Sequence, residues 1–486
     1  MDLAFFVLVL LDLLDFYCPM KKIILIFLVF ITTNALCQDL KYYRYDTDFL
    51  SKEFHKSRRD LIRKEMPANS VTVLFAAPER NRSNDDDFQY HQNPNFYYLT
   101  GLTEPNALLI IFKETQNIGG SMTDECLFVQ DRDPGAEVWN GRRLGADDAK
   151  QLLGFTAVFT DETFDTLQIS FKNFSSVFYL PLPKGLVDDK SEVADLYNLI
   201  EQFKKKSNYP PENGDNFKLS GWLASMREVK QPEELTLIRK AISISCDAHI
   251  EMMKASEPGM TEYQVQAIGE YVFKKNGSEY VGYPSICGGG ENSCILHYEN
   301  NRRKLEAKDV LLLDMGAEYH GYSADVTRTL PASGKFSEEQ KLIYQIVYNA
   351  QEAAFKECKP GNEFQGPHKA ASEVIKKGLL ELGIINDEKD FRKYFMHGTS
   401  HYLGLDVHDA GTRTKLKAGN IITVEPGIYI PDGSPCDPKW WNIGIRIEDD
   451  ILIIESGYEN LSAKAPRTIE KTEEMMKQKS IFNQGK

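Results

Sequence analysis

One feature of this 486-residue chain restricts its fold most: an apolar run ends in a carboxylate, and a second carboxylate follows shortly after a polar segment. Asp314 ends the run Val310 to Leu313, and Asp325 follows a polar tip. A hairpin turn centred on Tyr319-His320 would place Asp314 opposite Asp325, roughly 5 Å apart. Two opposed carboxylates repel each other unless cations lie between them, and such pairs suit two divalent ions ~3.5 to 4 Å apart. The alternative is a hairpin tip that carries ordinary surface carboxylates.

Two more carboxylates occupy similar positions at the ends of apolar strands. Glu425 follows the strand-like run Ile421 to Val424. In the expected strand Ile443 to Ile453, residue alternation places Arg446 and Glu448 on one face. An Arg-Glu pair by itself is usually structural, but a buried lone glutamate is costly unless it is paired or bound to a metal.

The histidines are unevenly distributed along the chain. Of nine histidines, His397, His401 and His408 fall within twelve positions. The segment Met396 to His401 contains Gly and Ser, which favour a loop or a strand edge over a helix. It lacks the glutamate of the HExxH zinc helix. The glycine cluster before His297 lacks a phosphate-loop lysine, and we interpret it as a tight connection.

Composition excludes several classes of protein. The chain has 71 acidic and 57 basic side chains and a formal net charge of −14, with 42% hydrophobic and 26% charged residues. This is a globular composition, neither that of a disordered chain nor that of a multi-spanning membrane protein. Nucleic acid is not an expected partner, because nonspecific binding depends on Lys and Arg at the phosphates.

The first 37 residues have the layout of a secretory signal. Lys21 and Lys22 precede the apolar stretch Ile23 to Ile31, and small residues lead to a cleavage site after Cys37. The preceding apolar run has no basic residue before it, so translation starting at Met20 is our hypothesis. An uncleaved anchor and a lipoprotein at Cys37 are the alternatives. We expect an exported protein, periplasmic or secreted, with no stable membrane span and with its six remaining cysteines as free thiols.

Periodicity indicates two folded domains. Short β-rich runs followed by helical periodicity predict an N-terminal α/β domain over residues 40–215. A linker is expected at 216–235, after a stretch rich in Lys, Pro, Asn and Gly. Amphipathic helices and then apolar strands predict a second domain over 236–470, in which helices flank an antiparallel sheet, and a tail over 471–486. The predicted fold class is α+β.

The local contexts of five residues carry a family resemblance. In order and in surroundings they resemble the ligands of metallopeptidases with the pita-bread fold: Asp314, Asp325, His401, Glu425 and Glu448. Among these metallopeptidases, the sequence most resembles the aminopeptidase P family, in the strings MHGTSHYLGLDVHDAG, TVEPGIYI and GIRIEDD. The N-terminal half resembles the creatinase/prolidase N-terminal domain in FAAPE, YLTG and AEVWNGRR. The resemblance covers the chain from about residue 50 onward.

The resemblance implies a metal-dependent aminopeptidase that cleaves the bond between an N-terminal residue and a following proline. Two Mn²⁺ ions would be bridged by Asp325 and Glu448, with Asp314 completing one site and His401 and Glu425 the other. A hydroxide bridging the ions would attack the peptide, and Glu425 would carry the proton to the leaving proline nitrogen.

The resemblance assigns roles to further residues. His408 would stabilise the oxyanion, His297 and His397 would position the scissile bond, and Arg446 would hold a metal-ligating carboxylate. Substrate contacts are expected from three more residues, the last of which would grip the free N-terminus: Tyr429, Trp139 and Asp85. Arg413 lies in a loop shorter than the family's usual form, so its role is open. The implied partners are peptides with proline in second position, and the implied assembly is a homo-oligomer, a dimer or tetramer.

Three other functions share features with this prediction. Prolidase has the same fold and ligands but accepts only Xaa-Pro dipeptides. Non-enzymatic pita-bread domains, which serve as binding modules, lose ligands, and creatinase-like enzymes work without them. The present sequence retains all five candidate ligands.

Overall fold

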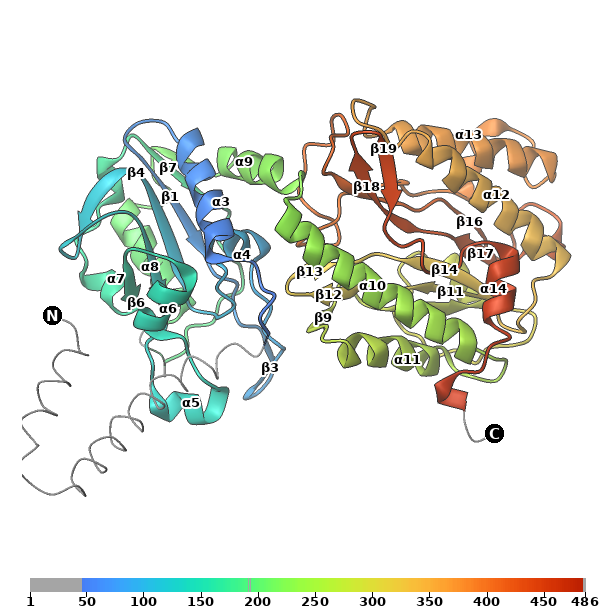
Figure 1. Ribbon diagram of the computed structural model, residues 1–486, viewed down its shortest axis with the longest axis horizontal. Coiled ribbons are helices and arrows are strands. Elements are labelled where there is room, and N and C mark those ends of the chain that lie inside the picture. Colours follow the sequence, from blue (N-terminus) through green and yellow to red (C-terminus); the bar gives the residue numbers. More distant parts are fainter. Residues whose placement is uncertain (1–45, 191, 193, 484–486) are drawn as a thin grey trace, which may run out of the picture. The chain divides into compact units, whose positions relative to one another are not determined.

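The computed structural model describes residues 46–190, 192 and 194–483, which fall into two compact units (Figure 1). The main division lies between Gly214 and Asp215, and the short segments 60–65 and 178–180 are grouped with the second unit. The predicted signal segment lies outside the described residues. Within the described part of the chain, no helix is both long and apolar enough to span a membrane. The segment expected as a linker, 216–235, contains helix α9 (Lys218–Arg227) and the start of α10 (Pro232–Ala255).

The first unit is built on a mixed six-stranded sheet in the order β6-β5-β4-β1-β7-β8. Its central strands are β1 (Ser70–Phe75), β4 (Leu108–Ile118) and β5 (Ser121–Val129), and β1 is buried at every position. The outer strands are β6 (Val158–Thr160), β7 (Ser176–Tyr179) and β8 (Gly214–Asp215). A strand without an exposed position implies cover on both faces.

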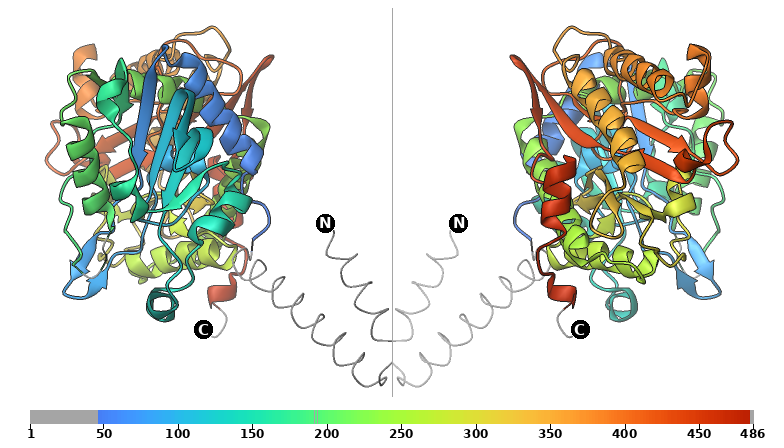
Figure 2. Two further views of the ribbon diagram at one scale, coloured as in Figure 1. Left: turned by 90° about the vertical axis from the view of Figure 1, so that its left-hand side faces the viewer. Right: turned by 90° about the vertical axis from the view of Figure 1, so that its right-hand side faces the viewer.

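Two helices provide that cover. On one face, Arg59 of α3 (Lys52–Glu65) forms a buried ion pair with Glu125 of β5 at 2.9 Å. On the other, Phe75 of β1 stacks edge-on against Phe203 of α8 (Leu196–Ser207). Figure 2 (left) shows this sheet with its helices. The N-terminal α/β domain predicted from the sequence is therefore present.

Short elements complete the first unit, and two of them carry residues discussed below. The shorter helices are α4 (Pro94–Thr100), α5 (Pro134–Asn140), α6 (Gly145–Leu153) and α7 (Thr163–Thr166). Strands β2 (Asn81–Ser83) and β3 (Asp86–Asp87) form an exposed hairpin.

The second unit places strands between two pairs of helices. The first pair is α10 and α11 (Glu262–Lys275), and the second is α12 (Glu338–Phe355) and α13 (Gly366–Glu381), which lie side by side in Figures 1 and 2. The apolar faces of α12 and α13 bury a large core with the strands near the C-terminus. This is the expected α+β arrangement, with helices flanking antiparallel strands. Helix α13 was not among the sequence-based predictions.

The strands of this unit form small antiparallel sheets. One sheet contains β10 (Ile286–Gly289), β11 (Val310–Asp314) and β14 (Thr327–Pro331), and another contains β9 (Tyr280–Val281), β12 (Ala317–Tyr319) and β13 (Tyr322–Ser323). The C-terminal strands are β15 (Ile421–Val424), β16 (Gly427–Ile430), β17 (Ile443–Arg446), β18 (Asp449–Ile454) and β19 (Gly457–Asn460). The glycine cluster expected as a tight connection therefore begins as strand β10. Helix α14 (Ile469–Met475) is the last α-helix of the unit, and a short 3-10 helix (Ile481–Asn483) follows it.

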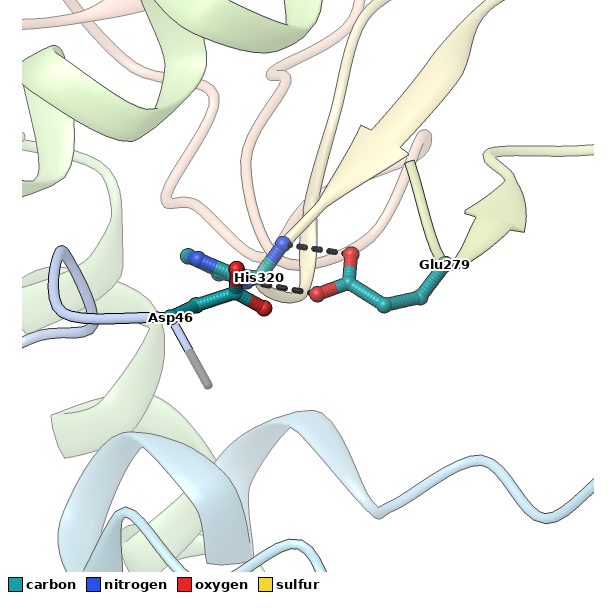
Figure 3. A group of neighbouring side chains, drawn as sticks. All are labelled: Asp46, Glu279 and His320. Atoms are coloured by element: carbon teal, nitrogen blue, oxygen red, sulfur yellow. Dashed lines mark hydrogen bonds and ion pairs between the residues drawn. The ribbon is translucent and has the colours of Figure 1, made fainter. Parts of the chain in front are cut away.

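The turn of the central hairpin lies one residue later than predicted. Tyr319 pairs with Tyr322, so the turn centres on His320 and Gly321, both with positive φ. A two-residue turn of this type needs positive φ at both positions, which glycine adopts without strain. The turn is held by Glu279, whose carboxylate accepts hydrogen bonds from the His320 backbone N–H (3.0 Å) and Nδ1 (2.5 Å) (Figure 3).

Candidate metal centre

The shifted turn changes the partner of Asp314. Asp314 pairs with Thr327 across β11 and β14, so the predicted pairing of Asp314 with Asp325 is wrong. Asp325 instead lies in the irregular segment between β13 and β14. The two carboxylates still meet, because the Tyr283 hydroxyl lies 2.5 Å from Asp314 Oδ1 and 2.7 Å from Asp325 Oδ1. Tyr283 was not predicted, since no motif marks it and it lies far from Asp314 in sequence.

The expected strand Ile443 to Ile453 is broken where the functional glutamate lies. Strand β17 ends at Arg446, β18 begins at Asp449, and the two belong to different sheets. Glu448 lies in the break, where its N–H donates to the Thr327 carbonyl at 3.1 Å and its Oε2 accepts from Thr327 Oγ1 at 2.7 Å. The strand alternation used to place Glu448 therefore does not apply, although Glu448 does reach the same pocket as Arg446.

One buried amide positions both glutamates. Gln351 of α12 is fully buried, and its Nε2 lies 3.1 Å from the Val424 carbonyl and 3.2 Å from the Ile447 carbonyl. These carbonyls immediately precede Glu425 and Glu448. The same nitrogen also lies 2.9 Å from Asp449 Oδ2. A helix distant in sequence thus holds the ends of β15 and β17 in place.

His401 presents one nitrogen to the carboxylates. Its Nδ1 lies 3.0 Å from the Tyr402 carbonyl, an acceptor, so Nδ1 carries the proton and Nε2 is left as a lone-pair donor. Nε2 lies 3.3 Å from Asp325 Oδ2 and 3.6 Å from Glu425 Oε1. The predicted loop is held to β15, where the Thr423 N–H donates to the His401 carbonyl at 3.0 Å.

The donor set fits divalent cations. One ligand atom from each of Asp325, His401 and Glu448 lies within 4.8 Å of the others, and all three residues are buried. Glu448 Oε1 is buried and accepts no hydrogen bond from any residue that the structure describes. A buried carboxylate oxygen without a donor is costly unless a cation satisfies it.

The pKa values of the carboxylates reflect their crowding. Burial raises the pKa of Asp325 and of Glu448 well above the ordinary range, and the neighbouring carboxylates raise both further. Burial, with the charge of Glu448, raises the pKa of Glu425 to about 8. Burial opposes ionisation of Asp314 too, but the Arg446 guanidinium, 2.6 Å away, lowers its pKa overall. If these carboxylates are all ionised at neutral pH, they require compensating cations in addition to Arg446.

These residues line a pocket of about 490 Å³. Besides the five candidate ligands it is lined by four more of the predicted site residues: His297, His397, His408 and Arg446. The ring of His408 stands edge-on to that of His401, with centroids 4.4 Å apart. Residues that were not predicted also line the pocket: Tyr283, Pro284, Ile286, Leu296, Glu299, Gly398, Ser400 and Val407. Their residue types carry no distinguishing signal, and only the fold brings them together.

The three residues predicted to contact substrate are not among the residues that line this pocket. Tyr429 is fully buried and is not among the pocket-lining residues; its hydroxyl contacts His397 and Arg446 instead. Trp139 on α5 is 86% exposed, and Asp85 is exposed in the turn between β2 and β3. Both belong to the first unit. Arg413, whose role the sequence left open, does line the pocket.

Two family models match the chain. Residues 55–178 match the N-terminal domain of aminopeptidase P, and residues 236–455 match metallopeptidase family M24. Xaa-Pro aminopeptidases of Escherichia coli and Haemophilus influenzae are 36% and 35% identical to it, over 88% of this chain and 98% of each relative.

Solved structures of aminopeptidases P have the same fold as this chain. Aminopeptidase P from E. coli with the inhibitor Pro-Leu has a TM-score of 0.79 at 34% identity, covering 88% of this chain and 98% of that one. Proline aminopeptidase P II from Yersinia pestis has the same TM-score and identity, and is covered completely. The second unit is accordingly a pita-bread domain, and the chain belongs to the aminopeptidase P group of metallopeptidase family M24.

Proposed function

We propose that this chain is a metal-dependent aminopeptidase that removes the first residue of peptides with proline in second position. The observation that carries the proposal is the meeting of four acidic side chains and one imidazole in a single pocket, which three further histidines and two arginines also line. Membership of the aminopeptidase P group supports the assignment of substrate class.

The five converging side chains would hold two divalent cations: Asp314, Asp325, His401, Glu425 and Glu448. Bound there, the ions supply the positive charge that brings the pKa of water toward neutrality and polarises a carbonyl. We propose Mn²⁺, because oxygen donors with a single imidazole suit this ion better than one that prefers thiolates. A zinc-substituted E. coli aminopeptidase P is among the similar structures, so the test below compares both metals.

Glu425 is the proposed proton carrier. Its carboxylate lines the pocket 3.6 Å from His401 Nε2, and bound cations would offset the burial that raises its pKa, which keeps the carboxylate ionised and able to accept a proton. Peptide cleavage before proline requires such a carrier, because the leaving nitrogen has no hydrogen of its own. Glu425 would take a proton from the attacking water and give it to that nitrogen.

The remaining polar side chains orient the substrate. His408, exposed at the pocket beside His401, is the proposed donor to the oxyanion, and His297 is exposed on the pocket lining to position the scissile bond. Arg446 donates to Asp314 Oδ2 at 2.6 Å and would keep that carboxylate in its ligating orientation. Asp85 and Trp139 are proposed to contact the substrate, as the family resemblance implies.

Export and oligomerisation complete the proposal. The basic pair and apolar segment before Cys37 support export to the periplasm or medium. On α5, Val138 and Trp139 are 81% and 86% exposed, which supports burial of this helix in a homo-oligomer. N-terminal sequencing of the exported protein and light scattering of the purified protein test these two points.

One assay tests the activity itself. The purified protein is stripped with a chelator, and release of the first residue from Xaa-Pro-Xaa and Xaa-Pro peptides is measured after addition of Mn²⁺ or Zn²⁺. We expect cleavage of the tripeptide, restored best by Mn²⁺. Cleavage of the dipeptide alone would identify a prolidase instead. Absence of metal binding would identify a non-enzymatic binding module.

A further inference from the structure

The short stretch from the last residue of α9 to the start of α10 is unusually rich in buried charge. Arg227, Glu228 and Lys230 are only 2%, 0% and 4% exposed. Charged side chains are almost never buried this deeply without partners. All three find them in one stretch of chain nearly two hundred residues later, the loop 403–417. Figure 1 shows the two green helices that this segment connects.

The first contact is to Asp409, which is itself 4% exposed. Arg227 Nη2 donates to Asp409 Oδ1, and also to Asp406 Oδ2 at 2.8 Å. Lys230 Nζ donates to Asp409 Oδ2 at 2.6 Å. Each oxygen of the Asp409 carboxylate therefore accepts a hydrogen bond from a positively charged side chain. A Cβ at Gly404 would lie 2.2 Å from Asp409 Oδ2, so the loop backbone closes this tightly only because residue 404 is glycine.

Asp409 directly follows His408. The Asp409 N–H donates to the Tyr402 carbonyl at 2.9 Å, which closes the loop immediately after His401. The ion pairs of the Asp409 side chain therefore set the backbone from which the exposed His408 ring reaches the pocket.

The second contact is to the residues that flank Arg413. Glu228 Oε2 accepts hydrogen bonds from the Thr412 N–H at 2.8 Å and from Thr412 Oγ1 at 2.7 Å, and Glu228 Oε1 accepts from Lys417 Nζ. Arg413 itself is exposed, lines the pocket and has a φ of +52°. A non-glycine residue in this conformation needs its neighbours to be held.

We propose that the segment Arg227 to Lys230 is a positioning element for catalysis, which holds the loop 403–417 so that His408 stands at its working distance from the metal ligands. Arg227 and Lys230 do not line the pocket, so they act through Asp409 and are positioning residues rather than catalytic ones. Displacement of a catalytic group by about 1 Å can cost on the order of 100-fold in rate. This inference rests on the peptidase activity proposed above.

A double-mutant cycle on the full-length, Mn²⁺-loaded protein tests the proposal. We expect Asp409→Asn to lower kcat/KM for an Xaa-Pro-Xaa peptide by roughly 10- to 100-fold. In a His408→Ala background the same change should cost less than about 3-fold, because the group being positioned is already absent. Mn²⁺ affinity, measured by calorimetry, should stay within about 3-fold of wild type, since Asp409 is not one of the five candidate ligands.

A gentler variant covers the case in which Asp409→Asn does not fold. Asp406, whose side chain is 48% exposed, is the second carboxylate that Arg227 binds. We expect Asp406→Asn to lower kcat/KM about 3-fold in the wild-type background and to leave it unchanged in the His408→Ala background. The control is Glu459→Gln, which removes an exposed ion pair to Arg239 and should change nothing. Equal losses in both backgrounds would overturn the inference, as would unchanged kcat/KM in Asp409→Asn, whereas an inactive wild type would contradict the proposed function itself.

Discussion

The Tyr429 hydroxyl lies 2.8 Å from Nε2 of His397. Because His397 Nδ1 lies 2.7 Å from the Gly398 carbonyl, Nδ1 carries the proton and Nε2 accepts the hydrogen of Tyr429. The Tyr429 oxygen in turn accepts from Arg446 Nη1 at 2.8 Å. Burial, and then the charge of Arg446, lower the pKa of His397 to about 3. His397 is therefore neutral at physiological pH, and both of its nitrogens are occupied by the protein.

This arrangement predicts the effect of Tyr429→Phe. The variant leaves His397 Nε2 without a donor and releases one N–H of Arg446, so we expect a loss of about tenfold in kcat/KM, or roughly 1.4 kcal/mol. Mn²⁺ affinity should change less. Steady-state kinetics and calorimetry measure the two quantities. Tyr458→Phe, at a partly exposed tyrosine of β19, is the control and should match wild type. Wild-type kcat/KM in Tyr429→Phe would show that His397 needs no support.

Two site substitutions should abolish turnover without unfolding the protein. Glu425→Ala removes both a ligand and the proposed proton carrier, and His401→Ala removes the only nitrogen ligand among the five candidates. General acid-base catalysis alone contributes about 10²- to 10⁴-fold, so kcat should fall by at least about 10³-fold in each variant. Circular dichroism should remain that of wild type. Glu455→Gln, at the exposed turn between β18 and β19, should retain full activity. Near-normal turnover of either site variant with Mn²⁺ present would refute the site assignment.

Removal of metal should destabilise the protein as well as inactivate it. Without cations, burial and the neighbouring carboxylates disfavour the charged forms of Asp325 and Glu448 and raise the pKa of both, so a cation that binds these groups in the folded state stabilises that state. At a free metal concentration of about 100 times Kd, the expected stabilisation is ~2.7 kcal/mol. Thermal unfolding with Mn²⁺ and with chelator measures the difference. Glu448→Gln should show a much smaller response to chelator than wild type, and an equal response would place the stabilising ion elsewhere.

The buried carboxyl of Asp161, which is not part of the metal centre, should make the stability of the protein depend on pH. Burial, together with the charges of Glu162 and Glu192, raises the pKa of Asp161 to about 7. The folded state therefore holds a proton that the unfolded state has lost, and stability falls as pH rises from about 4 to about 7. Asp161→Asn should raise the free energy of unfolding by ~1 to 3 kcal/mol at pH 8 and leave it nearly unchanged at pH 4.

Urea unfolding of the two proteins at both pH values measures this effect. Asp147→Asn, at an exposed position in the first turn of α6, is the matched control and should change stability by less than about 0.5 kcal/mol at either pH. An equal gain in the Asp161 variant at pH 4 and pH 8 would rule out ionisation as the cause.

Gly316 is required by a close approach of the backbone. A Cβ at this position would lie 1.8 Å from the Ala324 carbonyl oxygen and 3.0 Å from the Tyr283 ring. Gly316→Ala should therefore cost about 3 kcal/mol and weaken Mn²⁺ binding, since Asp325 follows Ala324 and contacts Tyr283. Gly221→Ala is the control, because nothing lies near its Cβ within helix α9. A fully stable Gly316→Ala protein with wild-type metal affinity would contradict the argument.

The sequence by itself determined the type of several long elements and the identity of the candidate ligands, although helix α13 and strand β10 were not predicted. Apolar runs that end in a carboxylate mark strand ends at Asp314 and Glu425 whatever the rest of the chain does, because burial of apolar residues sets the strands. The helices α10 to α12 likewise follow from their periodicity and their N-terminal capping residues.

Only the tertiary structure decided how these side chains meet. The hairpin turns at His320-Gly321, where both residues have positive φ, rather than at Tyr319-His320. This one-residue shift of the turn pairs Asp314 with Thr327 instead of Asp325. Glu448 reaches the site because Gln351, on a distant helix, binds the carbonyl before it. Local periodicity cannot report such contacts, since they join segments whose proximity arises only when the separate apolar faces pack together.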